Sequence, residues 1–344
     1  VVINVNANAN LSPKIATAFD REIKAFRKSM LSRVVDTLKQ VSQVDTSSYV
    51  MAIRVEGKQS IRFLYVLNRS GLFSRGDVHA FLQKMFADYG YKDYIYMPEW
   101  KYPPLFLNSL PEDFAKTEDK SFRNRLFIQI LAPLALLVNE RITLERYPLL
   151  LMRERLDKGE KLTAENKKEL ERLAKKYDVF TRMKGDGRYE ILLAELLNRA
   201  DEVPPSFLIA AAAAESNWGT AREVRLGNAL YKRKVWYTEE GIKPLEDPDD
   251  SYRIKTYPTL LAAMEDYALI FNSDVNFAHF RDLRRQRRNH DKPLRGNAMA
   301  YNMVRGSPLE NYAGLISYII TFYDLVNLDE AELGSVNMFW KKKE

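Results

Sequence analysis

One carboxylate, Glu215, stands among residue types that suit acid catalysis. Residues 211–219 read AAAAESNWG, so four alanines precede this carboxylate and a Trp and a Gly follow it. On a helix that begins near Pro205, the alanines give the carboxyl group apolar surroundings in which it resists ionisation, as a general acid requires. Trp218 offers a flat surface for a sugar ring, and Gly219 can end the helix. An ordinary exposed Glu at a helix end explains this short pattern equally well.

The other reactive residue types narrow the chemistry. The absence of cysteine excludes disulfides, thiolate nucleophiles and zinc–thiolate sites. The three histidines lie far apart in the sequence and form neither an H-E-x-x-H zinc motif nor a visible Ser-His-Asp triad: His79, His279 and His290. We therefore expect no metal and no cofactor, and hydrolytic chemistry would have to use carboxylates.

Several ordered motifs carry a family resemblance. AAAAESNWG followed by GNALYKRKVW resembles the A-x-x-x-E-S-x-W-G and N-L-F-G patterns of the bacterial glucosaminidase family. YRIKTYPTLL is similar to the family's F-R-x-Y-x-S segment, and RGSPLENYAGLISY is similar to its late Y-S-x-x-x-x-x-Y segment. Within this family, which includes flagellar peptidoglycan hydrolases, the Bax-type proteins look closest. The resemblance covers about residues 120–328.

The resemblance implies a lysozyme-like helical domain that cleaves the β-1,4 bond after N-acetylglucosamine in peptidoglycan. Glu215 matches the family's catalytic acid. Four further residues match motif positions that line the substrate cleft: Asn228, Tyr231, Tyr257 and Tyr312. Peptidoglycan glycan strands are the implied partner.

The sequence departs from the family pattern at three positions. Tyr231 and Lys232 stand where the family has Phe and Gly, and Gly306 stands where it has Tyr. These departures keep open a weakly active or inactive module that binds or assembles cell wall. A lytic transglycosylase is the other alternative, although the G-L-M-Q segment usual in those enzymes is absent.

A second carboxylate would decide the mechanism of a glycosidase. Two carboxyl groups lie ~5–5.5 Å apart in retaining enzymes and ~6.5–9.5 Å apart in inverting ones. In the family, the partner of the acid lies on a lobe that corresponds here to residues 235–252, VWYTEEGIKPLEDPDDSY. We favour Glu246 as that partner, with Asp250 second. A solvated acidic loop, and a route through the substrate's own acetamido group, are the alternatives.

Hydrophobic periodicity divides the chain into unlike parts. Alternating apolar residues on both sides of Gly57 predict a β-hairpin over 48–68, whereas the pattern is helical from about residue 116. We expect an α+β protein, with a mainly α-helical lysozyme-like catalytic domain and a small α+β N-terminal module. The boundaries are a flexible arm at 1–14, the α+β module at 15–115, a helical lead-in at 116–180, the catalytic domain at 181–330 and a tail at 331–344.

Charge and hydropathy limit the partners and the location. The formal net charge of +7 favours a polyanionic partner. The basic run at 281–295 lacks the aromatic residues that stack nucleic-acid bases, so we expect no nucleic acid; wall polymer or plain solvent could face this run. The apolar stretch 126–140 is short and contains Gln129 and Pro133, which predicts a buried helix and no transmembrane segment. A mature exported chain, located in the periplasm, would have lost its signal already.

Overall fold

The structure is a computed structural model, and it describes two compact units within the chain. The described residues are 49–56, 60–67, 91, 94, 100–103, 105–111, 114–236, 240–245, 251–303 and 310–334. One unit comprises residues 1–92, 103–116 and 334–344, and the other comprises 93–102 and 117–333. Each unit is considered separately below.

The described part of the first unit contains a three-stranded sheet. Strands β1 (Tyr49–Glu56) and β2 (Ser60–Leu67) form an antiparallel hairpin, and β4 (Leu105–Leu107) pairs with β2 in parallel. A short 3-10 helix, η3 (Phe114–Lys116), ends the unit's central segment. The hairpin predicted from the alternating pattern is thus confirmed. The helix expected over 15–43 lies outside the described residues.

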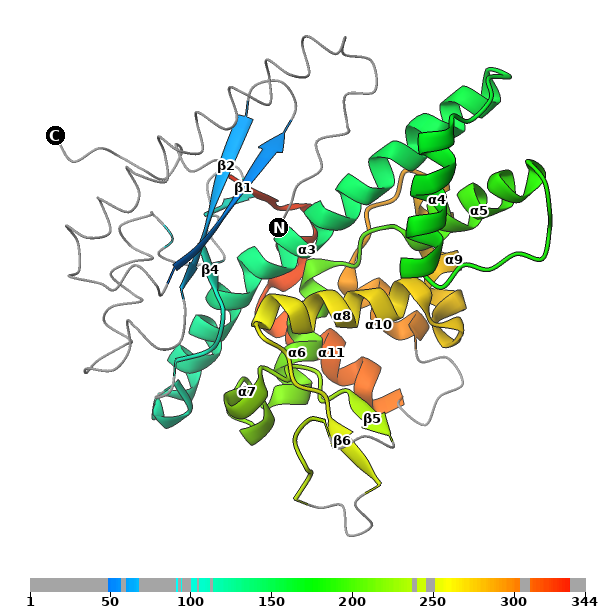
Figure 1. Ribbon diagram of the computed structural model, residues 1–344. Helices are drawn as coiled ribbons and strands as arrows, with labels where there is room; N and C mark the ends of the chain where they lie inside the picture. The colour runs from blue at the N-terminus through cyan, green and yellow to red at the C-terminus, as the bar shows by residue number, and fades with distance from the viewer. Residues whose placement is uncertain are drawn as a thin grey trace, which may run out of the picture. The chain divides into compact units, whose positions relative to one another are not determined.

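The second unit is mainly α-helical with a few short strands, as the sequence predicts (Figure 1). Its α-helices are α3 (Lys120–Asp157), α4 (Ala164–Lys176), α5 (Gly187–Arg199), α6 (Pro205–Ser216), α7 (Arg222–Gly227), α8 (Leu260–Ser273), α9 (Ala278–Asn289), α10 (Gly296–Met303) and α11 (Glu310–Phe322). Two 3-10 helices are η4 (Val275–Phe277) and η5 (Leu325–Glu330). The strands form two pairs: β3 (Lys101–Tyr102) with β7 (Glu332–Leu333), and β5 (Lys234–Trp236) with β6 (Tyr252–Ile254).

Helix α3 is the central support of this unit. Its 38 residues run past α5, α6 and α8 and pack against all three (Figure 1). The residues from Leu126 to Val138 are buried apart from the half-buried Gln129, which confirms the predicted core helix. Among the described helices, α3 is long and apolar enough to cross a bilayer by length and composition, yet 72% of its apolar window is buried within the protein. That degree of burial is typical of a core helix.

A second apolar cluster joins α4 and α5 to the C-terminal half of α3. Leu170 and Leu173 of α4 are fully buried against Leu193 and Leu196 of α5. Thr163 begins α4 with a capping box, because its hydroxyl accepts from the backbone N–H of Asn166 and the Asn166 side chain accepts in return. Within the charged sequence 158–179, Ala164–Lys176 therefore folds as an amphipathic helix with one apolar face.

A buried guanidinium, that of Arg284 on α9, ties the end of α5 to the loop that leads into α6. Arg284 is completely buried and donates to the carbonyl oxygens of Asp201 at 2.8 Å, Glu202 at 2.9 Å and Asn198 at 2.9 Å. A further bond of 2.7 Å reaches Oδ1 of Asn272. Burial lowers the pKa of Arg284 to about 10, although Asp201 opposes that shift. The guanidinium satisfies carbonyl groups at a helix end that would otherwise be buried without partners.

Asp201 supplies the negative charge of this cluster. Its buried carboxylate accepts 2.9 Å from Nη2 of Arg288, and it lies 3.7 Å from Arg284 and 3.7 Å from Arg146. Burial alone would raise the pKa of Asp201, but the three arginines outweigh burial and lower that pKa. The cluster is thus a buried ion network in which one carboxylate neutralises several cations.

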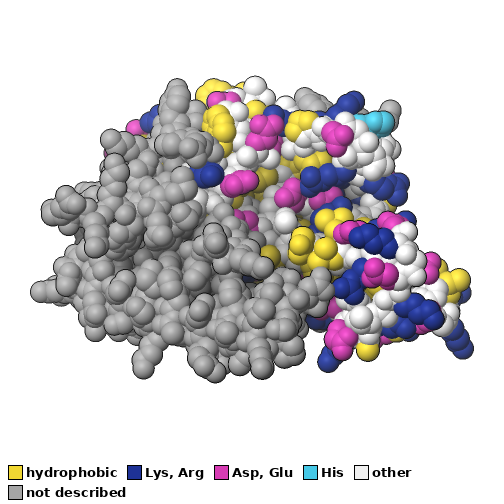
Figure 2. All heavy atoms as spheres, turned by 90° about the horizontal axis from the view of Figure 1, so that it is seen from above, with side chains coloured by type: hydrophobic (Ala, Val, Ile, Leu, Met, Phe, Trp, Pro, Cys, Tyr) yellow, Lys and Arg dark blue, Asp and Glu magenta, His cyan; other side chains and the backbone are white. Residues whose placement is uncertain are grey.

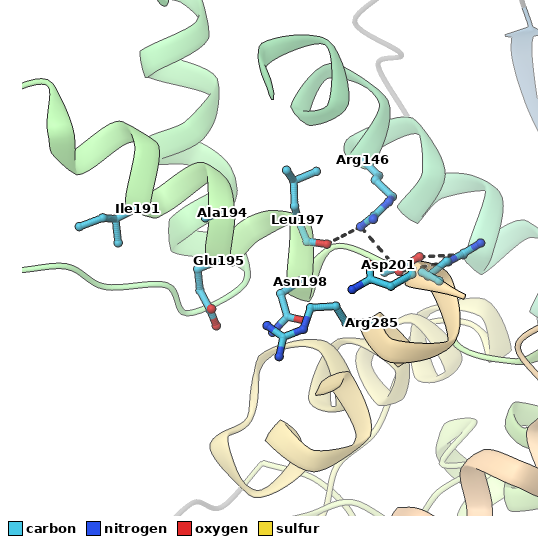
Figure 3. A pocket seen from close by; sticks show the side chains of 10 residues that line it. Arg146, Ile191, Ala194, Glu195, Leu197, Asn198, Asp201 and Arg285 are labelled. Atoms are coloured by element: carbon cyan, nitrogen blue, oxygen red, sulfur yellow. Dashed lines mark hydrogen bonds and ion pairs between the residues drawn. The ribbon is translucent and has the colours of Figure 1, made fainter. Parts of the chain in front are cut away.

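A surface hollow opens beside this network, between α3, α5 and α9 (Figure 3). The two carboxylates that line it are both paired: Glu195 with Arg199 at 2.7 Å, and Asp201 with its arginines. Figure 3 shows Arg146 turned toward Asp201, and Arg146 also donates to the carbonyl oxygen of Ala200 at 3.0 Å. Because both acids serve as counter-ions, neither is available as a proton donor, and we assign this hollow a structural role.

The surface charge of the described residues is mixed. On the face seen in Figure 2, Lys and Arg side chains alternate with Asp and Glu across the described surface, and apolar side chains lie between them. The described part of this face therefore carries no continuous basic patch of the kind that holds a nucleic-acid backbone.

Candidate active site

Helix α6 carries Glu215 through the middle of the second unit. Pro205 occupies its first turn, where the missing N–H costs nothing, and every residue from Pro205 to Ala213 is buried. A helix that is apolar on all sides must be enclosed, and α3, α10, α11 and η5 enclose this one. The prediction of a helix that begins near Pro205 is confirmed.

The start of α6 is held by a carboxylate from a distant part of the chain. Asp329 in η5 accepts from the backbone N–H of Ser206 at 2.9 Å, from its hydroxyl at 2.8 Å, and from the N–H of Gly296 at 2.9 Å. Burial raises the pKa of Asp329 to about 6 even against these hydrogen bonds. Only glycine fits at 296, because a Cβ there would lie 2.1 Å from the Ser206 hydroxyl oxygen. Asp329 thus fixes the first turns of α6 and α10 together.

The end of α6 is a left-handed turn directly after Glu215. The helix ends at Ser216, and Asn217, Trp218 and Gly219 have φ values of 49°, 56° and 75°. Gly219 was expected to end the helix, but Asn217 is the first left-handed residue because its short side chain tolerates that backbone. The buried Ser216 hydroxyl accepts from the N–H of Gly219 at 2.8 Å. This turn holds Glu215 in the last turn of the helix.

Two tyrosines lie beside the half-buried Glu215, namely Tyr267 of α8 and Tyr312 of α11. Burial raises the pKa of Tyr312, and Tyr267 and the charge of Glu215 raise it further. The pKa of Tyr267 is raised by burial and by Glu215 against the opposing effect of Tyr312. The Tyr312 hydroxyl is buried, and the side chains of Tyr267 and Glu215 are its hydrogen-bonding neighbours. The carboxyl group of Glu215 thus lies within a small cluster of tyrosine hydroxyls.

A stack of rings connects this carboxylate to the chain after α7. Tyr231 stacks on Tyr267 with ring centres 3.8 Å apart and planes 6° apart, and Phe207 lies beyond Tyr267 at 6.5 Å. The Tyr231 hydroxyl donates to the carbonyl oxygen of Leu208 at 3.1 Å, and burial raises the pKa of Tyr231. Tyr231 therefore lies below the site as part of its floor, and it offers its ring to Tyr267.

Asn228 and Tyr257 lie side by side, and hydrogen bonds join the two chain segments that carry them. Asn228 caps α7 with a φ of 53°, and its amide donates to the carbonyl oxygen of Tyr257 at 3.1 Å. The N–H of Tyr257 in turn donates to the carbonyl oxygen of Gly227 at 2.8 Å. Oδ1 of Asn228 is buried and has no hydrogen bond among the described residues. Asn228 is thus a buried polar group with an unused acceptor.

Asp266 of α8 anchors the root of the β5–β6 hairpin. Its carboxylate accepts from Arg233 at 2.5 Å, Lys255 at 2.9 Å and the Tyr257 hydroxyl at 2.6 Å. Burial alone would raise the pKa of Asp266, but these three hydrogen bonds lower it. Because Arg233 precedes β5 and Lys255 follows β6, both ends of the hairpin are fixed to α8 by one carboxylate.

Trp218 packs against protein on part of its surface. Its ring lies 4.6 Å from that of Tyr323 and 6.0 Å, edge to face, from that of Phe127 on α3. The residue is half-buried. The Trp218 ring therefore stabilises the turn after Glu215 and leaves only its remaining surface for a sugar.

Lys232 occupies the position where the related pattern has glycine. Its φ of 42° is in the left-handed region, which costs a residue with a Cβ about 1–2 kcal/mol. We expect Lys232→Gly to raise the free energy of unfolding by about 1 kcal/mol, measured by urea denaturation. Lys234→Gly, two residues later and in strand β5, is the matched control and should lower it by about 0.5–1 kcal/mol. Equal destabilisation by both changes would show that the Lys232 side chain itself contributes.

The predicted second carboxylates lie beyond what the structure describes. Glu246 and Asp250, and also Gly306, fall in the segments 246–250 and 304–309, outside the described residues. The hairpin that bears the acidic segment is described, with Trp236 paired to Tyr252 across the strands. Within the described residues, no group of three or more His, Asp or Glu side chains could hold a metal ion.

Three residues near this site were not predicted. Tyr267 lies between Glu215, Tyr231 and Tyr312, and Asp266 anchors the hairpin. The signal for both was the stretch Glu265-Asp266-Tyr267, which interrupts the apolar residues of α8. Trp236 was missed because it lies between charged residues; its side chain is 54% exposed, and Lys234 lies 4.1 Å from the ring of Tyr252 beside it.

The fold and the site together define a mainly α-helical domain with a single tyrosine-lined carboxylate at a helix end. No ion pair is found for Glu215 among the described residues, in contrast to Asp201 and Asp266, so its carboxyl group is available for proton transfer. The surrounding tyrosine rings and the buried amide of Asn228 place both apolar surface and hydrogen-bonding groups beside this carboxylate.

Comparison with known proteins identifies a bacterial relative. The chain is similar to Protein bax of Escherichia coli (strain K12), with 28% identity over 209 residues. The aligned region covers 60% of this chain and 72% of Protein bax. No protein-family profile matches the chain, and no solved structure matches it.

Proposed function

We propose that this protein is a peptidoglycan hydrolase that cleaves the β-1,4 glycosidic bond after N-acetylglucosamine. The observation that carries the proposal is the position of Glu215, which is half-buried at the end of α6, without an ion pair among the described residues, and beside Tyr267 and the buried Tyr312 hydroxyl. The similarity to Protein bax supports it. Glycan strands would be the partner, and an exported, periplasmic location would follow from that substrate.

In the proposed reaction, Glu215 donates its proton to the leaving glycosidic oxygen as the bond to C1 breaks. Water supplies the hydroxyl group to C1, and its remaining proton restores Glu215. The positive charge that develops at C1 needs a nucleophile or a stabilising carboxylate on the other face of the sugar. Glu246, Asp250 or the substrate's own acetamido oxygen would take that role. The Tyr312 hydroxyl is placed to hydrogen-bond the sugar or the carboxyl group of Glu215.

The test is digestion of purified peptidoglycan by the full chain, with mass analysis of the ends of the products. A hydrolase of this type releases reducing N-acetylglucosamine ends. A lytic transglycosylase would leave anhydro ends on muramic acid, because the sugar's own hydroxyl replaces water. Binding to peptidoglycan without any new ends would assign the protein as a wall-binding module and overturn the proposed hydrolysis.

A further inference from the structure

Helix α11 carries apolar side chains on its exposed side as well as its buried side. Ile316, Ile319 and Ile320 are buried in the core. On the other side, Leu315, Tyr318 and Phe322 are 44%, 59% and 64% exposed. Their spacing of three and four residues places them along one side of the helix, and we call these three residues the aromatic stripe. A contiguous exposed apolar surface of this kind marks an interaction site.

The stripe is connected by ring contacts to the turn that follows Glu215. The rings of Tyr318 and Phe322 stack with centres 5.5 Å apart and planes 26° apart. Phe322 contacts Tyr323 edge to face at 5.0 Å, and Tyr323 contacts Trp218 at 4.6 Å. Trp218 is the third residue after Glu215. The exposed rings are thus connected, through Tyr323 and Trp218, to the turn that follows the candidate acid.

The same helix also reaches the site at its other end. Tyr312, which lies beside Glu215, precedes Phe322 by ten residues, which is about 15 Å of helix. A surface of this length is longer than one sugar ring. It therefore offers positions for further sugars of a strand whose scissile bond lies at Glu215.

The composition of the stripe favours a neutral sugar chain as its occupant. From Asn311 to Phe322 the helix has no charged residue, so neither an anionic polymer nor an acidic peptide would gain an ion pair here. Two of the three exposed side chains are aromatic, and ring faces pack against the C–H face of a sugar while the Tyr318 hydroxyl can bond its edge. Continuity with the candidate site favours the substrate strand over a second copy of this chain.

We propose that the aromatic stripe binds sugar residues of the glycan strand on one side of the bond that Glu215 cleaves. This inference rests on the proposed function and makes the enzyme one that prefers long strands. Affinity for sugar oligomers should then rise with their length, because each added ring contacts more of the stripe.

The experiment measures binding by calorimetry in the full-length Glu215→Gln protein, so that no turnover is needed. The probes are N-acetylglucosamine oligomers from the disaccharide to the hexasaccharide. We expect the hexasaccharide to bind more tightly than the disaccharide, and Phe322→Ala and Tyr318→Ala each to weaken hexasaccharide binding about tenfold. Disaccharide binding should be unchanged. Phe180→Ala is the matched control, because Phe180 is 82% exposed and belongs to the loop after α4.

Three results would overturn the inference: no binding of any oligomer, affinity that does not depend on length, or hexasaccharide affinity that is unchanged in both stripe variants. A dimer that dissociates in the stripe variants, seen by light scattering with unchanged sugar affinity, would instead assign the stripe to self-association. The proposed function fails separately, if peptidoglycan acquires no new reducing ends while the stripe still binds long oligomers.

Discussion

Replacing Glu215 with Gln is expected to lower the turnover of peptidoglycan by roughly two to four orders of magnitude, the usual worth of positioned proton transfer. An amide keeps the shape and the hydrogen-bonding capacity of the side chain, but it has no proton to donate to the leaving oxygen. Glu215 is half-buried and has no ion pair among the described residues, so the change disrupts no network of charges. The melting temperature should therefore stay close to that of the wild type.

The matched control is Glu265→Gln on α8. Glu265 is also a partly exposed carboxylate of this unit, but it forms an ion pair with Arg141. We expect its loss to leave turnover within about twofold, because an exposed pair contributes little to stability and takes no part in the chemistry. A folded Glu215→Gln protein that releases reducing ends at the wild-type rate would remove Glu215 from the reaction. Glu246→Gln should be as damaging as Glu215→Gln if Glu246 is the second carboxylate, and milder if the substrate's acetamido group acts instead.

Replacing Asp201 with Asn is expected to lower the free energy of unfolding by about 3–5 kcal/mol. The change removes the one negative charge that Arg284, which is fully buried, shares with Arg146 and Arg288. Removing a single partner from a buried ion network leaves an uncompensated charge, which costs far more than the loss of an exposed pair. Urea denaturation of both proteins at neutral pH measures the difference.

The pH dependence of that difference follows from the lowered pKa of Asp201. Its contribution is fully present above the pKa of an unfolded Asp, about 3.9, and is lost as the pH falls through the lower folded value. The two proteins should therefore differ by a constant amount between about pH 5 and pH 8 and converge below about pH 4. Asp282→Asn is the control, because Asp282 lies on α9, the helix that also carries Arg284. The partly exposed ion pair of Asp282 with Arg285 should contribute less than about 0.5 kcal/mol to stability. Equal losses in the two variants would contradict the network.

Periodicity and turn chemistry predicted much of the fold. The β1–β2 hairpin follows from strict alternation around Gly57, and α6 follows from a Pro at its first turn and an unbroken apolar run. These features depend on neighbours in the sequence, which a sequence displays directly. Glu215 was identified as a candidate acid for the same reason, because its flanking alanines, Trp and Gly form one short segment.

Contacts between segments that lie far apart in the sequence could not be predicted in this way. The basic run at 281–295 was expected to face wall polymer or solvent, yet Arg281 is 3% exposed and Arg284 is fully buried, where both bind backbone carbonyl groups. Arginine buries readily when it can satisfy several carbonyls, but those carbonyls lie more than 80 residues upstream of Arg284. Tyr267 was not predicted for the same reason. Its position between Glu215 and Tyr231 arises only when α6 and α8 pack against each other.

The left-handed turn after Glu215 also limits how this segment can evolve. Three successive residues, Asn217, Trp218 and Gly219, must adopt a backbone that most side chains avoid. A substitution at 217 or 219 must therefore first fit this backbone, and only asparagine, aspartate and glycine adopt it at low energetic cost. At 218 a bulky ring occupies this backbone despite the cost, because its packing against Phe127 and Tyr323 offsets the strain. A substitution at 218 would therefore have to replace packing as well as tolerate the left-handed backbone.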